Sequence, residues 1–174
     1  MLLSVENSTI SGNSAIGNGG GICNTQNRGG ATLELDGTIL NAGNSGENIF
    51  NGGGTVTSLG YNVGSDNGGG FLIGPGDQIN TDPMLGPLQG NGGPTFTHAL
   101  LPGSPAIDAG DPNFTPPPFY DQRGLGFPRV VNGRIDKGSF EVQSRGTPTP
   151  TPTATPTPRP TPTPRPRPTP GPRP

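Results

Sequence analysis

Short apolar stretches alternate with polar, glycine-rich turns through the first half of the chain. Thr32–Leu35 (TLEL) places apolar side chains at every second position, which is the period of a β-strand with one buried face, and we expect Thr55–Leu59 (TVTSL) to alternate in the same way. No stretch has the 3.6-residue period of an amphipathic helix. The pattern therefore predicts an all-β fold of short strands joined by tight turns.

The strand pattern recurs as an internal repeat. VENSTISGNSAIGNGGGICN (Val5–Asn24) and LDGTILNAGNSGENIFN (Leu35–Asn51) share Thr-Ile, then Gly-Asn, then an apolar pair followed by Asn. A third, shorter copy covers Gly54–Phe71. Periods in the twenties are typical of a parallel β-helix, in which each turn of chain adds a few inward side chains to one continuous core.

Aligning the first two copies predicts the register between them. Ile10 is expected to align with Ile39, and Ile22 with Ile49. Glycine supplies the positive φ angles and close backbone approach that the corners of such a stack require. The glycine triplets are Gly19–Gly21, Gly52–Gly54 and Gly68–Gly70. The asparagines expected to hydrogen-bond along the stack are Asn13, Asn24, Asn44 and Asn51.

The spacing changes at Pro75, where prolines become frequent. Proline cannot occupy a central position of a sheet ladder, so the repeats are expected to end there. We divide the chain into repeats (1–74), a closing segment (75–143) and a tail (144–174). The closing segment is expected to plug the open end of the stack. The predicted plug comprises Phe96, Leu100, Leu101, Ala106 and Ile107, with Leu85 and Leu88 beside them.

Charged residues gather in the closing segment and are the main candidates for chemistry. They are Asp108, Asp111, Asp121, Arg123, Arg129, Arg134, Asp136 and Glu141. The favoured interpretation is structural, with aspartates capping turns and pairing with arginines. A second interpretation is a Ca²⁺ site, for which the candidates are Asp108, Asp111, Asp121 and Asp136. A third is a carboxylate pair for glycoside hydrolysis.

Other residues with possible chemistry are expected to be structural. His98, the only histidine, lies beside apolar residues, and Cys23 has no basic partner nearby in the sequence. The turn residues Gly92, Gly93 and Pro94 belong to the same structural set. Aromatic residues able to stack on sugar rings, although packing is their commoner fate, are Tyr61, Phe71, Phe119 and Tyr120.

Charge and composition narrow the classes of partner. Up to Gln143 the chain has 12 acidic and five basic residues, whereas from Ser144 onward it has five arginines and no acid. A body with a net charge of −7 argues against nucleic acid as a partner. The single cysteine excludes an intrachain disulfide and a cysteine zinc cluster. We expect no cofactor beyond the Ca²⁺ just considered, and no membrane span.

The tail is a low-complexity segment, with 13 of the 24 prolines between Thr147 and Pro174. Proline at almost every second position favours disordered polyproline II chain and a spacer role. Its nine threonines are candidate glycosylation sites. No LPxTG-like sorting signal is visible in it.

The N-terminal residues indicate where this chain would belong in a longer protein. Met1-Leu2-Leu3 lacks the features of a signal peptide, and a strand pattern already begins at Leu3. We expect the C-terminal portion of a longer, extracellular or cell-surface protein, with a signal peptide and further repeats upstream.

The ordered motifs resemble a known family. The ISGNS and GGGICN elements resemble the repeats of polymorphic outer-membrane-type β-helix proteins. The series TSLGYN, INTDPMLGPLQGNGGPTFTHALLPGSPAIDAGD and DQRGLGFPRVVNGRIDKGSFE resembles the C-terminal end of bacterial choice-of-anchor Q proteins. The resemblance covers about Val5–Glu141 and implies a right-handed, pectin-lyase-like parallel β-helix that is secreted or displayed on a surface. It implies no general enzymatic activity.

Two functions follow as hypotheses. The first is a non-catalytic protein for adhesion or surface display, whose partners would be surface glycans or other envelope proteins. The alternative is the C-terminal part of a polysaccharide lyase or glycoside hydrolase with its catalytic repeats upstream, which the fold analogy alone motivates.

Overall fold

The computed structural model describes residues 1–25 and 30–143, and in this part the chain is all-β. It contains short strands and one 3₁₀ turn, and no helix of the described residues is long and apolar enough to cross a membrane. The expected proline-rich stalk, residues 144–174, lies outside the described residues. The strands are β1 Leu2–Glu6, β2 Thr9–Ser11, β3 Ile22–Thr25, β4 Thr32–Asp36, β5 Ile39–Asn41, β6 Ile49–Gly52, β7 Thr55–Gly60, β8 Val63–Gly64, β9 Leu85–Gln89 and β10 Thr97–Leu100, and the 3₁₀ turn is η1 Gly68–Gly70.

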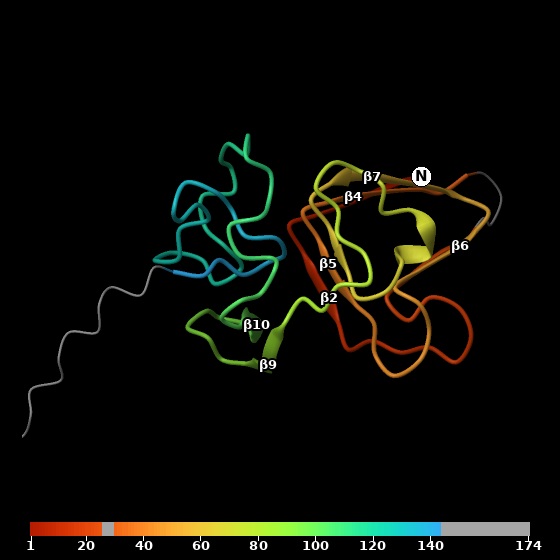
Figure 1. Cartoon of the computed structure of the whole chain (residues 1–174), viewed down its shortest axis with the longest axis horizontal. Helices are drawn as coiled ribbons and strands as arrows, with labels where there is room; N and C mark the ends of the chain where they lie inside the picture. The colour runs from red at the N-terminus through yellow and green to blue at the C-terminus, as the bar shows by residue number, and fades with distance from the viewer. Residues whose placement is uncertain (26–29, 144–174) are drawn as a thin grey trace, which may run out of the picture. The chain divides into compact units, whose positions relative to one another are not determined.

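The first eight strands form three parallel sheets, in the orders β1-β4-β7, β2-β5-β8 and β3-β6 (Figure 1). Each strand from β1 to β5 therefore pairs with the strand three places further along the chain. The first repeat is β1–β3, the second β4–β6 and the third β7–β8. The only antiparallel pair of named strands in the described part joins β9 and β10.

The register between repeats was predicted correctly at one position and incorrectly at another. Ile22 pairs with Ile49, as expected. Ile10, however, pairs with Leu40, and Ile39 pairs with Thr9. A shift of one residue moves a side chain to the opposite face of a sheet. The expected alignment was wrong because Ile39 faces away from the interior that Ile10 and Leu40 share.

Stacked apolar residues form the interior between the three sheets. Leu3, Leu33 and Val56 occupy one register row, and Val5 lies on Leu35 in another. The alternation predicted for Thr32–Leu35 is confirmed, since β4 has buried leucines and half-buried polar residues in turn. The alternation predicted for Thr55–Leu59 is wrong at Leu59, which is exposed because the register between β4 and β7 shifts there. The buried interior cluster is Leu33, Leu35, Leu40, Ile49 and Leu72.

A second apolar cluster lies on the other face of the β2-β5-β8 sheet. Ile39 and Val63 pack there against Leu100, Ala106 and Phe140 of the closing segment. Gly138 donates to the carbonyl of Gly37 across this contact, at 2.7 Å. The closing segment therefore covers the outer face of one sheet, which the proline pattern did not predict.

The proposed plug is consequently wrong in part. Leu100 and Ala106 are buried and Ile107 packs partly against them, but Phe96, Leu101 and Leu88 are exposed. The last repeat is instead covered by the start of the closing segment, because the backbone N–H of Tyr61 donates to the Pro75 carbonyl at 2.8 Å and Val63 forms a parallel bridge with Gln78. At the opposite end of the stack, β1, β2 and β3 each pair on one side only within the described residues.

Candidate functional site

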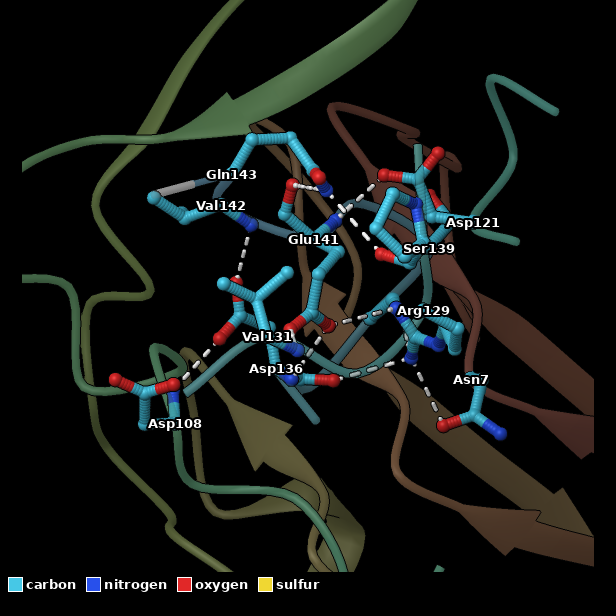
Figure 2. Close-up of polar contacts among 12 residues, drawn as sticks. Asn7, Asp108, Asp121, Arg129, Val131, Asp136, Ser139, Glu141, Val142 and Gln143 are labelled. Atoms are coloured by element: carbon cyan, nitrogen blue, oxygen red, sulfur yellow. Dashed lines mark hydrogen bonds and ion pairs between the residues drawn. The ribbon is translucent and has the colours of Figure 1, made fainter. Parts of the chain in front are cut away.

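Five charged residues of the closing segment form a buried network rather than an open site (Figure 2): Asp121, Arg123, Arg129, Asp136 and Glu141. The other three candidates, Asp108, Asp111 and Arg134, are half-buried. Asp121 and Arg123 make the first ion pair of the network, with 2.6 Å between Oδ2 and Nη2. The Arg123 guanidinium also lies 4.0 Å from the ring centre of Phe127 and 3.8 Å from that of Phe140. Its Nη2 donates to the Glu141 carbonyl at 2.5 Å. A planar, delocalised cation suits this position between two rings.

Glu141 and Arg129 form the second charged pair, with 3.7 Å between Oε2 and Nη1. Both oxygens of Glu141 are also occupied by the backbone. Oε1 accepts from the N–H of Val131 at 3.0 Å, and Oε2 accepts from the N–H of Asp136 at 2.9 Å. Arg129 Nη2 donates to Asn7 Oδ1 at 3.0 Å, which ties this network to the first repeat.

The Asp136 carboxylate, like that of Glu141, accepts hydrogen bonds from the backbone with both oxygens. Its two oxygens accept from the backbone N–H groups of Asp108 and Val142, each at 2.6 Å. A buried backbone N–H without a partner costs free energy, and the closing segment has little regular sheet to supply one. These carboxylates therefore accept the hydrogen bonds that neighbouring strands would accept in a sheet, and their role is to hold the closing segment together.

Burial controls the protonation of this network. It raises the pKa of Glu141 to about 8, against the opposing effects of Arg129 and of two backbone N–H donors. It likewise raises the pKa of Asp136 and lowers that of Arg129. A charged group removed from water resists ionisation unless its partners compensate fully.

The four Ca²⁺ candidates do not converge on one centre. Asp108 and Asp136 meet through a backbone N–H, Asp111 accepts from the N–H of Asn113, and Asp121 is held by Arg123. In residues 1–25 and 30–143, no group of three or more His, Cys, Asp or Glu side chains is placed to hold a metal ion.

The remaining predicted structural residues lie where the closing segment folds back on itself. A Cβ on Gly92 would lie 2.7 Å from the Phe127 ring, and one on Gly93 would lie 2.6 Å from the Arg123 Cα. Only glycine allows both approaches. His98 Nδ1 lies 2.7 Å from the Gly86 carbonyl, while Pro94 is exposed.

Lys137 is a buried residue that the sequence did not single out. Its Nζ donates to the Gly76 carbonyl at 2.7 Å and to Gln78 Oε1 at 3.0 Å. Burial lowers its pKa to about 8. Lysine is ordinarily exposed, so nothing in the sequence pointed to a buried role for this residue.

Two adjoining hollows form a groove between the first repeat and the closing segment. The larger has a volume of about 510 Å³ and the smaller about 240 Å³, and both are lined by Gln122 and Ser139. The other residues of the larger hollow are Glu6, Asn7, Ser8, Pro118, Tyr120, Asp121 and Arg129. Those of the smaller are Thr9, Ser11, Asn13, Leu88, Phe96, Thr97 and His98. Of the four aromatic residues proposed for sugar stacking, only Tyr120 lines this groove.

Comparison with known proteins adds no relative. No family model and no curated protein matches the sequence, and no solved structure matches the fold.

Proposed function

We propose that the chain is a non-catalytic, secreted or surface-displayed protein that serves in adhesion or surface display. The observation that carries this proposal is that the clustered carboxylates of the closing segment bind its own backbone. Asp121, Asp136 and Glu141 are buried and bind backbone N–H groups, so the residues that could suggest catalysis are engaged in structure. The accessible groove then offers a surface for recognition.

We further propose that the three parallel sheets wind as a right-handed β-helix of the choice-of-anchor Q type. The pairing of each strand with the third strand after it and the stacked apolar rows support the β-helix. The motifs from Thr57 to Glu141 support the family. An experimental structure with left-handed connections between successive strands would contradict the proposed handedness.

The free edge of the first repeat supports the expected upstream repeats. Leu3, Val5, Ile10 and Ile22 continue the interior rows, but no strand covers them in the described residues. We expect a further repeat of the same protein to add strands there. In a longer chain carrying such a repeat, the amide hydrogens of β1 should exchange more slowly with solvent than in residues 1–174. Equal exchange rates would argue against this docking.

Binding experiments test the adhesion function directly. Purified protein should bind saturably to cells, to immobilised surface glycans or to isolated envelope proteins. If the protein binds none of the three, the adhesion function is wrong. Incubation with polysaccharides tests the alternative, because a lyase or hydrolase releases unsaturated or reducing ends. Sustained turnover would favour that alternative over our proposal.

A further inference from the structure

The groove is continuous over two hollows, as a site for an extended chain must be. Its two hollows share Gln122 and Ser139, so a polymer can pass from one to the other without leaving the surface. One wall follows the first repeat from Glu6 to Asn13, and the other belongs to the closing segment. The repeat wall is continuous in sequence, which gives it a regular series of side chains.

The side chains of this groove are mainly neutral hydrogen-bonding groups. Asn7, Ser8, Thr9, Ser11 and Asn13 line the repeat wall. Hydroxyls and carboxamides both donate and accept hydrogen bonds, as sugar hydroxyls do. This composition matches a polyhydroxylated ligand better than an apolar one.

Each hollow also holds one exposed aromatic ring. Tyr120 lines the larger hollow and is 43% exposed, while Phe96 lines the smaller and is 65% exposed. An aromatic face packs against the C–H face of a sugar ring, and the Tyr120 hydroxyl adds a polar group. Two rings in successive hollows suit successive residues of a polymer.

The buried network fixes a donor at the groove. Arg129 holds the Asn7 side-chain oxygen, so the Asn7 amide nitrogen is turned away from the network, as Figure 2 shows. Gln122 is held similarly, because its Nε2 donates to Thr95 Oγ1 at 3.0 Å. Side chains already fixed by the protein lose less conformational entropy when a ligand binds.

The charge of the groove selects against acidic polymers. Among the described residues that line the groove, Arg129 is the one arginine or lysine, and its guanidinium is buried, with Nη2 bonded to Asn7 and Nη1 3.7 Å from Glu141 Oε2. Glu6 adds a negative charge to the same hollow, whereas the buried Asp121 is paired with Arg123. A polyuronate would therefore meet the Glu6 carboxylate, and no exposed arginine or lysine among the described lining residues compensates for that repulsion.

We propose that this groove binds a neutral polysaccharide chain. The inference rests on the proposed adhesion function and names the class of ligand that it recognises. Tyr120 and Phe96 supply the stacking surfaces, and Asn7 supplies a fixed hydrogen-bond donor between the network and the ligand.

Affinity electrophoresis of the whole chain tests the ligand class. Native gels would contain xylan, glucomannan or mixed-linkage β-glucan as neutral probes, and polygalacturonate as the acidic probe. We expect at least one neutral polymer to retard the protein and polygalacturonate not to do so. No retardation by any neutral polymer, or equal retardation by polygalacturonate, would overturn the proposal.

Matched variants test the location. Tyr120→Ala and Phe96→Ala should each weaken binding about tenfold or more, whereas Phe119→Ala should bind as the wild type does. Phe119 is a suitable control because it is 66% exposed and lines neither hollow. Equal unfolding midpoints would show that the variants remain folded. Retardation unchanged in both groove variants would place the site elsewhere.

Asn7→Asp provides a second, nearly isosteric test. Aspartate can keep the contact with Arg129 and tolerates the positive φ of 45° at this position. It replaces the amide donor with an acceptor, so polysaccharide affinity should fall several-fold without loss of stability. Unchanged affinity would contradict the role of this donor. If the protein binds cells but no polysaccharide, the adhesion function remains supported. The proposal that the groove provides this adhesion would then be wrong.

Discussion

At the residue scale, the closing segment depends on side chains that do the work of a sheet ladder. Arg123 shows this most clearly, because one guanidinium binds the Asp121 carboxylate and the Glu141 carbonyl while lying between two aromatic rings. Lysine has the same charge, but it lacks both the fork of donors and the flat face. The planar shape of arginine is therefore required here in addition to its charge.

Arg123→Lys should consequently destabilise the fold by about 2–4 kcal/mol, since it leaves buried acceptors partly unpaired. Urea unfolding followed by circular dichroism measures this change. Arg134→Lys is a less demanding control, because Arg134 is half-buried, donates to the carbonyls of Ala109 and Gly110, and lies 5.9 Å from the centre of a single ring, that of Tyr61. Similar small losses in both variants would show that the arrangement of Arg123 between the rings contributes little.

Glu141 makes stability depend on pH. Burial raises its folded-state pKa from 4.5 to about 8, so between these values the folded protein binds a proton that the unfolded chain has released. The free energy of unfolding should therefore decrease as the pH rises from about 5 to 8, by at most about 5 kcal/mol. Asp136 acts in the same direction, because burial raises its pKa too. Glu141→Gln should flatten this part of the profile, and parallel profiles for variant and wild type would rule out Glu141 as the cause.

At the element scale, alternation along a strand predicted more than the alignment of repeats did. The period-two pattern of Thr32–Leu35 identified the buried leucines of β4, and Asn24 bonds to Asn51 at 3.1 Å as expected. The Thr-Ile motif led to the wrong alignment of Ile10 with Ile39 because β5 is buried on both faces. Ile39 and Leu40 are equally apolar, so the sequence does not say which of them faces the interior.

The position of a leucine along the stack should decide the cost of removing it. Leu33 is 1% exposed in the second repeat, whereas its register partner Leu3 is 49% exposed in the first. Leu33→Ala should cost about 2–5 kcal/mol, and Leu3→Ala about 1 kcal/mol or less in residues 1–174. Equilibrium unfolding of the two variants makes the comparison. Equal costs would mean that Leu3 is covered in solution, as a repeat or a second copy docked on β1 would do.

At the scale of the whole molecule, residues far apart in the sequence hold the closing segment to all three repeats. Ser139 bonds to Thr9 of the first repeat and Gly138 to Gly37 of the second, while Val63 of the third repeat packs against Ala106 and Phe140. Lys137 also bonds to Gly76, at the start of the closing segment itself. These contacts could not be predicted from local patterns, because serine, glycine and lysine carry no signal of long-range pairing. The groove was missed for the same reason. Its walls are Glu6–Asn13 and side chains from more than 70 residues later, which only the folded chain brings together.

Gly138 offers a direct test of this attachment. Its φ is +87°, and a Cβ there would lie 2.6 Å from Ile39 Cδ1 and 2.7 Å from Thr9 Oγ1. Alanine would be strained by the backbone and would also push the closing segment off the β2-β5-β8 sheet. We expect Gly138→Ala to cost about 3 kcal/mol or more in unfolding free energy.

Gly133→Ala separates the two effects. Gly133 has a nearly equal φ of +85°, but a Cβ there meets nothing within 4 Å, so its substitution should cost only the backbone strain of about 1 kcal/mol. The difference between the variants measures the packing of the closing segment on the repeats. If that packing makes the repeats and the closing segment one cooperative unit, Gly138→Ala should lower the midpoint of a single unfolding transition that near- and far-ultraviolet circular dichroism both report. Separation into two transitions would instead show that the repeats fold without the closing segment, and that the groove between them is the first feature lost on heating.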